Sequence, residues 1–337
     1  MGLFQKLLGG RRDDDAAPRL DLGAFGKHPG RKDHLDIAAG AGELAKIHLA
    51  LYREGIRHQI DTQAWENLEP EKRLAGFDHS FLWLRPPHVF LGLLWSSTDA
   101  IGRAEYPMVV CIDGQKVSPG FMLAKLLPGL ERLRSACQQT TSAEEVERNC
   151  RDGQQQLTGV LSRASAAEIQ GTPAVDARRR FLERPELGPD RLGLLRAFHE
   201  VNSSLAGMGA SNRQRATHLR LPLASESSSE ALGLWSVFLR CIVAEPIPVL
   251  LIVRAGVRWF DALVGEPGPE DFFCLQTSPK AMPLVTEIPY QLPADLNQKL
   301  AVVEAAFLPA GGAGGKVGQP AGPATSRTTA PNTSGLA

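Results

Sequence analysis

Short apolar runs alternate with amphipathic segments along the chain, a pattern typical of an α/β protein. Two apolar runs, residues 89–95 and 107–112, flank a polar connection and predict a pair of buried strands. Residues 249–253 are apolar at every position, so we expect this run in the centre of a sheet. Similar short runs predict further strands at residues 20–25, 80–84, 218–223 and 258–264.

Apolar residues that recur every three or four positions predict helices between these strands. They cover residues 43–56, 63–74, 121–139, 142–164, 191–205, 230–243, 269–275 and 295–307, with a further segment from 172 that ends at Pro185. Ser142 and Glu145 match a capping box at the start of the longest helix. We therefore predict α/β layers, with a mainly antiparallel sheet flanked by helices, in one extended or two related units.

Composition and element order suggest where the chain divides. A charge run and Pro18 mark residues 1–18 as a leader outside the fold, and residues 309–337 are rich in Gly, Ala, Pro, Ser and Thr, which predicts a disordered tail. Between them we expect an α/β domain at 19–140, a helical connection at 141–210 and a second α/β unit at 211–308. The two units have a similar element order, but no residue-level repeat supports duplication.

Charge and cysteine content exclude several classes of protein. The chain has 37 basic and 37 acidic residues, so we do not expect nucleic acid or an anionic membrane as its main partner. No apolar run approaches the roughly 20 residues that span a bilayer, and a short amphipathic turn near the start allows peripheral membrane contact at most. The five cysteines are scattered without a CxxC spacing, which favours reduced thiols in a cytoplasmic protein.

The polar connection at residues 96–106 contains charges that are unusual between two apolar strands. Asp99 and Arg103 are predicted to pair and to be partly buried, because an unpaired buried charge is costly. Gly102, between them, suits a positive φ. If the pair is buried, Arg103→Ala should cost about 3–5 kcal/mol of stability.

A second polar loop follows the first predicted strand, at residues 26–33. Its Gly26-Lys27 pair resembles part of a phosphate loop, but the rest of GxxxxGK[ST] is missing and Pro29 removes a backbone donor, so no nucleotide is expected here. His28, His34 and nearby carboxylates, Asp33 among them, could in principle bind a metal, but a solvated polar loop is the expectation. No zinc motif and no GxSxG elbow occur, so we predict no cofactor, no metal and no enzyme activity.

Residues in the polar connection resemble a known family. The similarity lies in three short stretches: Ser97-Thr98-Asp99, Ile101-Gly102-Arg103 and Tyr106-Pro107-Met108. They resemble the PSxDxVGRxFPL signature of TagF-type proteins, a family associated with bacterial type VI secretion. Ser96 stands where the family has proline, and one residue is inserted between Arg103 and Pro107.

The upstream loop resembles the GKLPxxGDF opening of the same family, in the same order and at a matching spacing. It reads Gly26-Lys27-His28-Pro29 and then Asp33-His34-Leu35, with Lys32 in place of the family's glycine and His34 in place of its phenylalanine. The resemblance covers residues 20–138. The candidate partner-binding or structural residues are those of the two motifs: Gly26, Lys27, Pro29, Asp33, Ser97, Asp99, Gly102, Arg103 and Pro107.

The resemblance implies a non-enzymatic, post-translational repressor of a type VI secretion system that acts through a forkhead-associated-domain scaffold protein. Two alternatives are a structural or accessory subunit of a secretion assembly, and a hydrolase that uses Asp33, Asp99 and Arg103. If the two motif loops share one end of the sheet, Lys27 and Lys32, together with Arg31, would form a basic rim suited to an acidic protein surface.

Overall fold

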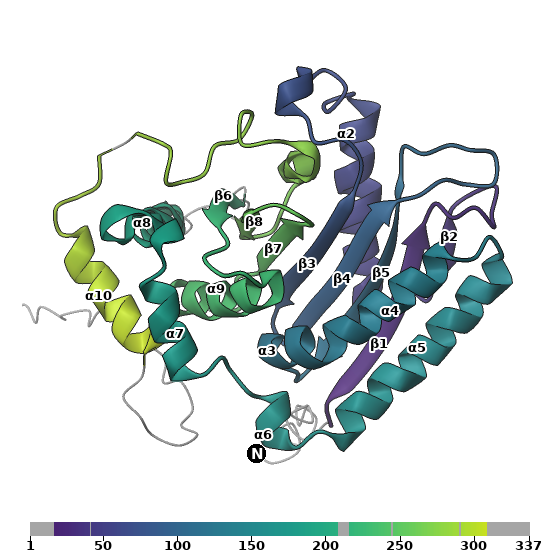
Figure 1. Cartoon of the computed structure of the whole chain (residues 1–337), viewed down its shortest axis with the longest axis horizontal. Coiled ribbons are helices and arrows are strands. Elements are labelled where there is room, and N and C mark those ends of the chain that lie inside the picture. The colour runs from purple at the N-terminus through teal and green to yellow at the C-terminus, as the bar shows by residue number, and fades with distance from the viewer. Residues whose placement is uncertain (1–16, 41, 208–215, 244, 290, 309–337) are drawn as a thin grey trace, which may run out of the picture.

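The computed structural model describes residues 17–40, 42–207, 216–243, 245–289 and 291–308, and it has an α/β fold (Figure 1). Its centre is an eight-stranded sheet in the order β2-β1-β5-β4-β3-β7-β8-β6, in which every pair of neighbours is antiparallel. The strands are β1 (Arg19–Gly26), β2 (Leu35–Ile37), β3 (Asp78–Arg85), β4 (His88–Ser96), β5 (Pro107–Gln115), β6 (Thr217–Pro222), β7 (Val249–Arg254) and β8 (Trp259–Val264). The predicted fold class, an antiparallel sheet with flanking helices, is confirmed.

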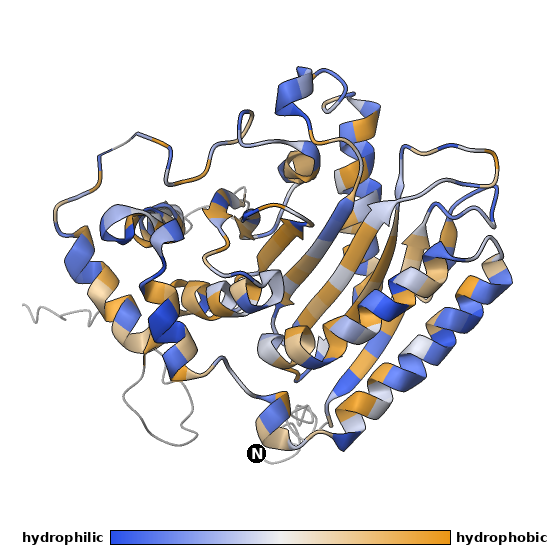
Figure 2. Ribbon diagram, viewed as in Figure 1, coloured by the Kyte–Doolittle hydropathy of each residue, from blue (hydrophilic) through white to orange (hydrophobic). Residues whose placement is uncertain are grey.

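Both faces of the sheet are covered, because successive residues of a strand point to opposite sides. In β4, Leu91 and Leu93 belong to one apolar cluster, while Phe90 and Leu94 belong to a second cluster on the other face. Hydrophobic residues accordingly dominate the central strands in Figure 2. This double burial explains why the strand sequences are continuous apolar runs and do not alternate with polar residues.

Helical segments on the first face contribute to the larger cluster, except for one 3-10 turn, Pro189–Arg191, which buries no residue. They are α3 (Pro119–Phe121), η4 (Met122–Leu126), α4 (Leu127–Gln138), α5 (Ala143–Arg163), α6 (Ala166–Ile169), α7 (Val175–Leu182), η5 (Pro185–Leu187), η6 (Pro189–Arg191), α8 (Leu192–Gly207), α9 (Ser228–Ile242) and α10 (Leu296–Phe307). The second face is covered by α1 (Gly42–Ile47), η2 (His48–Ile56), α2 (Arg57–Asp61) and η7 (Pro269–Gln276). No helix among the described residues has both the length and the apolarity to cross a membrane.

The two predicted α/β units share one sheet. β3 from the first unit pairs with β7 from the second, with Leu82 opposite Leu251, so the hydrogen-bonded ladder continues across the predicted division. The predicted leader lies outside the described residues except for residues 17 and 18. The predicted tail, residues 309–337, lies wholly outside them.

The prediction of a helix at residues 63–74 is wrong. The chain there forms turns and a single 3-10 turn, η3 (Pro70–Lys72). Gln63 has a φ of 53°, which ends the preceding helix. Trp65 is buried and its indole N–H donates to the Phe273 carbonyl at 2.9 Å, so a tertiary contact holds this segment in a loop.

The predicted start of α5 is correct, although the capping differs. The Ser142 hydroxyl accepts a hydrogen bond from the Glu145 amide at 3.3 Å, as in a capping box. The Glu145 carboxylate, however, accepts a hydrogen bond from Thr140 in place of the Ser142 amide. One half of the capping box is therefore present.

Candidate functional site

The strand order brings the two motif loops to the same end of the sheet. β1 and β4 both flank β5 and run antiparallel to it, so they run parallel to each other. One loop leaves β1 after Gly26 and the other leaves β4 after Ser96, next to the start of β5 at Pro107. The Ala100 amide donates to the Arg31 carbonyl at 2.8 Å, which ties the two loops directly to each other.

Asp99 is the centre of this site. Its carboxylate is fully buried and Lys27, only 3% exposed, donates to Oδ2 at 2.8 Å. Arg103 Nε donates to the same oxygen at 2.6 Å, and the amides of Ile101 and Arg103 donate to Oδ1 at 3.1 and 3.0 Å. Both carboxylate oxygens are thus engaged, and the loop wraps around the charge it buries.

These contacts determine the protonation state of Asp99. Burial by itself would raise the pKa of the carboxyl group, because the charged form loses its hydration. The hydrogen bonds from Lys27, from Arg103 and from the Ile101 amide outweigh burial and hold the pKa well below its usual range. Asp99 is therefore a carboxylate at neutral pH, with its lone pairs directed at internal donors and away from solvent.

The structure corrects the predicted roles of two basic residues. Arg103 does pair with Asp99, but its side chain is 48% exposed and its other end donates to the Lys32 carbonyl at 2.6 Å. Lys27 is the buried partner, and it therefore cannot belong to a basic rim. Arg31 and Lys32 are exposed, and Arg31 bonds Glu147 at 3.2 Å. Sequence reasoning missed the Lys27–Asp99 pair because no local pattern links residues so far apart in the chain.

Gly26 and Gly102 occupy different environments although both have positive φ, at 124° and 86°. A Cβ on Gly26 would lie 2.2 Å from the Pro107 carbonyl oxygen, which accepts hydrogen bonds from the Lys27 amide and the Tyr52 hydroxyl. A Cβ on Gly102 would meet nothing within 4 Å. Gly26 is required by close backbone approach, and Gly102 by backbone conformation alone.

We expect Gly26→Ala to destabilise the protein by at least about 3 kcal/mol, because both the strained φ and the clash must be relieved by moving β5. Gly102→Ala should cost only about 1 kcal/mol, since only the φ is unfavourable. Urea denaturation followed by circular dichroism measures both values. Equal costs for the two variants would contradict the proposed difference.

The remaining candidates lie around this centre. Pro29 and Ser97 are half-buried. Asp33 is exposed and its carboxylate accepts hydrogen bonds from the His34 amide at 2.8 Å and ring at 3.2 Å. The hydrogen bond from the His34 amide is the main reason that the pKa of Asp33 is lowered. The structure thus joins Lys27, Asp99 and Arg103 in one cluster and leaves Asp33 on the surface.

The His28 ring is hydrogen-bonded within the protein through both nitrogens, so it supports the loop at residues 26–33 and is unavailable as a metal ligand. It is buried, its Nε2 donates to the Cys137 carbonyl at 3.1 Å and its Nδ1 accepts from the Gly30 amide at 3.1 Å. These two bonds together require the neutral ring with its proton on Nε2. Both ring nitrogens are therefore committed to holding the loop against the end of α4.

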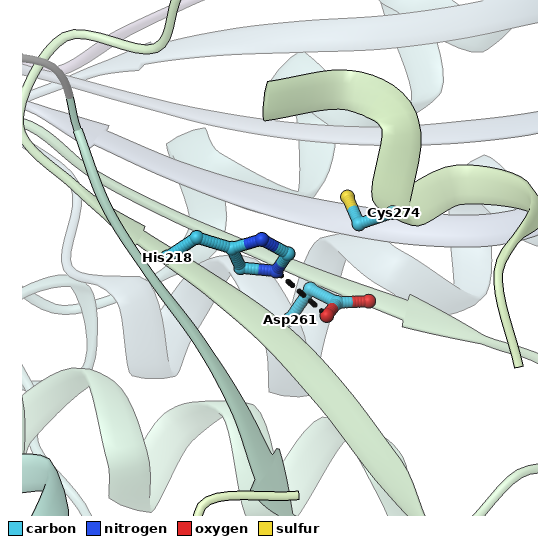
Figure 3. A group of neighbouring side chains, drawn as sticks. All are labelled: His218, Asp261 and Cys274. Atoms are coloured by element: carbon cyan, nitrogen blue, oxygen red, sulfur yellow. Dashed lines mark hydrogen bonds and ion pairs between the residues drawn. The ribbon is translucent and has the colours of Figure 1, made fainter. Parts of the chain in front are cut away.

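Among the described residues, one group combines three possible metal ligands: His218, Asp261 and Cys274, whose ligand atoms lie within 4.8 Å of one another (Figure 3). Arg220 Nε and the His218 ring both bond Asp261 Oδ1, at 2.9 and 2.8 Å. Burial holds the pKa of the Cys274 thiol well above its usual value. The Arg220 guanidinium thus already occupies the place of a cation, and these residues do not fit a metal ion.

No protein-family model and no curated protein sequence matches the chain. Among solved structures, it is similar to PA0076 from Pseudomonas aeruginosa PAO1, with 18% sequence identity and a TM-score of 0.30. The match covers 39% of this chain and 61% of PA0076. At this level the likeness supports no statement about function.

Proposed function

We propose that this protein is a non-enzymatic regulator that represses a type VI secretion system after translation, by binding a forkhead-associated-domain scaffold protein in the cytoplasm. The sequence resemblance over the two motif loops supports the choice of system and partner. The geometry of the same loops supports a binding role. The proposed binding face consists of the exposed parts of these loops, with Ile101 at its centre.

The observation that carries the proposal is the exposure of Ile101. Its side chain is 62% exposed, although it follows a fully buried carboxylate by only two positions. The Ile101 amide donates to Asp99 Oδ1 at 3.1 Å, so the backbone of the loop tip is fixed while the apolar side chain points into water. An apolar side chain on a pre-ordered loop favours protein binding, because little conformational entropy is lost when it is covered.

The charges around Ile101 provide orientation. Lys32 is exposed beside Arg103, and Asp33 is exposed next to them. A mixed polar rim around a small apolar centre is the usual composition of a protein–protein interface. Asp99 itself contributes by bracing the loop, since its oxygens are already bonded internally and have no role left as a base or nucleophile.

The test is a pull-down from cells that contain a type VI secretion system, with Ile101→Asp/Lys32→Glu as the face variant. Lys27→Glu is unsuitable, because it would place a second carboxylate beside buried Asp99. The matched control is Val302→Asp, since Val302 is 71% exposed on α10, an element that carries neither motif. We expect wild type and the control to recover the scaffold protein and the face variant to recover roughly tenfold less.

Equal recovery by the face variant and the control would place the partner face elsewhere on the molecule. Recovery of no scaffold protein by the wild type would contradict the proposed function itself. Circular dichroism melts of all three proteins establish that any loss of binding is not a loss of folding.

A further inference from the structure

The tip of the motif loop that follows β4 directs its backbone donors inward. The Ile101 and Arg103 amides donate to Asp99 Oδ1 at 3.1 and 3.0 Å, and the Gly102 amide donates to the Asp99 carbonyl at 3.0 Å. The Asp99 amide donates to the Arg103 carbonyl at 3.1 Å, and the Ala100 amide donates to the other motif loop at 2.8 Å. Every amide from Asp99 to Arg103 therefore already has an acceptor inside the protein.

The carbonyl groups at the centre of the tip have no such partners. Among the described residues, none donates a hydrogen bond to the carbonyl oxygen of Ala100, Ile101 or Gly102. All three residues are exposed, so water is the donor to these oxygens in the free protein. The backbone of the tip thus offers hydrogen-bond acceptors to a partner, while its donors are used internally.

The side chains of the tip form a narrow apolar projection. Ile101 is 62% exposed, and its neighbours are Ala100, with a single methyl group, and Gly102, with no side chain. A Cβ on Gly102 would meet nothing within 4 Å, so the space beside the isoleucine is open. A partner surface can therefore close around the Ile101 side chain as far as the backbone, and it then also covers the neighbouring carbonyl oxygens.

We propose that Ile101 inserts into a narrow apolar pocket of the partner, and that the rim of this pocket donates hydrogen bonds to the Ala100 and Ile101 carbonyls. This inference rests on the proposed function and adds the chemistry that the partner surface must have. Covering the isoleucine removes water from the adjacent oxygens, and a buried acceptor without a donor costs free energy. The partner must therefore supply donors, from arginine or asparagine side chains or from backbone amides.

An extended strand of the partner does not fit this tip. Strand addition pairs a row of alternating amides and carbonyls on both chains, and the tip can supply only the carbonyls. Net charge does not select the partner surface either, because Lys32 and Asp33, of opposite sign, are both exposed on the adjacent motif loop. The polarity of the hydrogen bonds therefore distinguishes the partner surface where charge does not.

The first test changes the size of the side chains at the tip and measures the affinity of the full chain for the scaffold protein by titration calorimetry. We expect Ala100→Leu and Ile101→Trp each to weaken binding roughly tenfold, because neither larger side chain fits a narrow pocket. The matched control is Ala301→Leu, the same change at an exposed position of α10, which should bind as the wild type does. A flat apolar surface would accept Ile101→Trp without loss, since tryptophan buries more area.

The second test observes the carbonyl groups directly by NMR. Ala100-Ile101 and Ile101-Gly102 are the only alanine–isoleucine and isoleucine–glycine neighbours in the sequence, so carbonyl-labelled alanine with nitrogen-labelled isoleucine isolates the Ala100 carbonyl. Carbonyl-labelled isoleucine with nitrogen-labelled glycine isolates that of Ile101. We expect both carbonyl resonances to move downfield on binding, as a stronger donor replaces water. The Ile101 and Gly102 amides should keep their protection from hydrogen exchange, because their internal bonds persist.

The outcomes separate this inference from the proposed function. Binding with unchanged carbonyl resonances would overturn the donor rim, and wild-type affinity for Ala100→Leu and Ile101→Trp would overturn the narrow pocket. Either result leaves the proposed function standing, since the scaffold protein is still bound. Failure of the wild type to bind the scaffold protein would contradict the proposed function and this inference together. Circular dichroism melts establish that each variant is folded before its affinity is compared.

Discussion

Asp99→Ala is expected to lower the melting temperature by roughly 10 °C. Lys27 is 3% exposed and would keep its charge in the core without the carboxylate that it contacts at 2.8 Å. The amides of Ile101 and Arg103 would also lose their acceptor, and the loop would lose the charge around which it folds. Thermal denaturation followed by circular dichroism measures the change.

Arg103→Ala is the matched control, because it removes the half-exposed partner of the same carboxylate. We expect a fall of about 2 °C or less, since solvent stabilises and screens an exposed charge. The 3–5 kcal/mol that the sequence suggested for Arg103 therefore belongs to the buried Lys27–Asp99 pair. Equal losses in the two variants would contradict this assignment.

Lowering the pH should remove the contribution of Asp99 to the stability of the folded protein. Its pKa is lowered in the folded protein, so its stabilising effect is fully present above the carboxyl pKa of the unfolded chain, near 4, and is lost as the pH falls toward the lower folded value. The difference in melting temperature between wild type and Asp99→Ala should therefore be constant from about pH 5 to pH 7 and narrow below about pH 4.

Arg220→Met should lower the free energy of unfolding by about 3–5 kcal/mol, because it leaves a buried carboxylate without its main cation. Arg220 binds Asp261 through two nitrogens, at 2.9 and 3.0 Å, and its guanidinium lies 3.8 Å from the centre of the Trp259 ring. It also donates to the carbonyls of Thr277 and Met282, at 3.0 and 3.1 Å. One side chain thus joins the β6–β8 strand pair to the segment that follows η7.

Urea denaturation measures this loss, with Arg258→Met as the control. Arg258 is half exposed and pairs with Glu186 and Glu226 on the surface, so its replacement should cost far less stability than that of Arg220, because solvent screens these pairs. A cost for Arg220→Met as small as that of the control would mean that Asp261 gains another partner or becomes protonated. The fold of β6 and β8 would then not depend on this ion pair.

The sequence by itself determined the elements whose signal is local. The apolar runs at 89–95 and 107–112 became β4 and β5, because a strand buried on both faces needs continuous apolar residues. The boundary of α5 was also predictable, since a serine three residues before a glutamate accepts a hydrogen bond from one of the first free amides of the helix. The antiparallel α/β class followed from the order of these elements, and two loops with polar motifs were found from their residues alone.

The tertiary structure decided what depends on the order of strands in the sheet. β3 pairs with β7, which merges two predicted units, and β6 pairs with β8, which sets Arg220 opposite Asp261. Lys27 meets Asp99 because β1 and β4 run in the same direction on either side of β5. The order of the strands depends on the apolar surface that the whole chain buries when it folds. No short stretch of sequence contains that information. The buried ion pair at the candidate functional site was therefore visible only in the folded molecule.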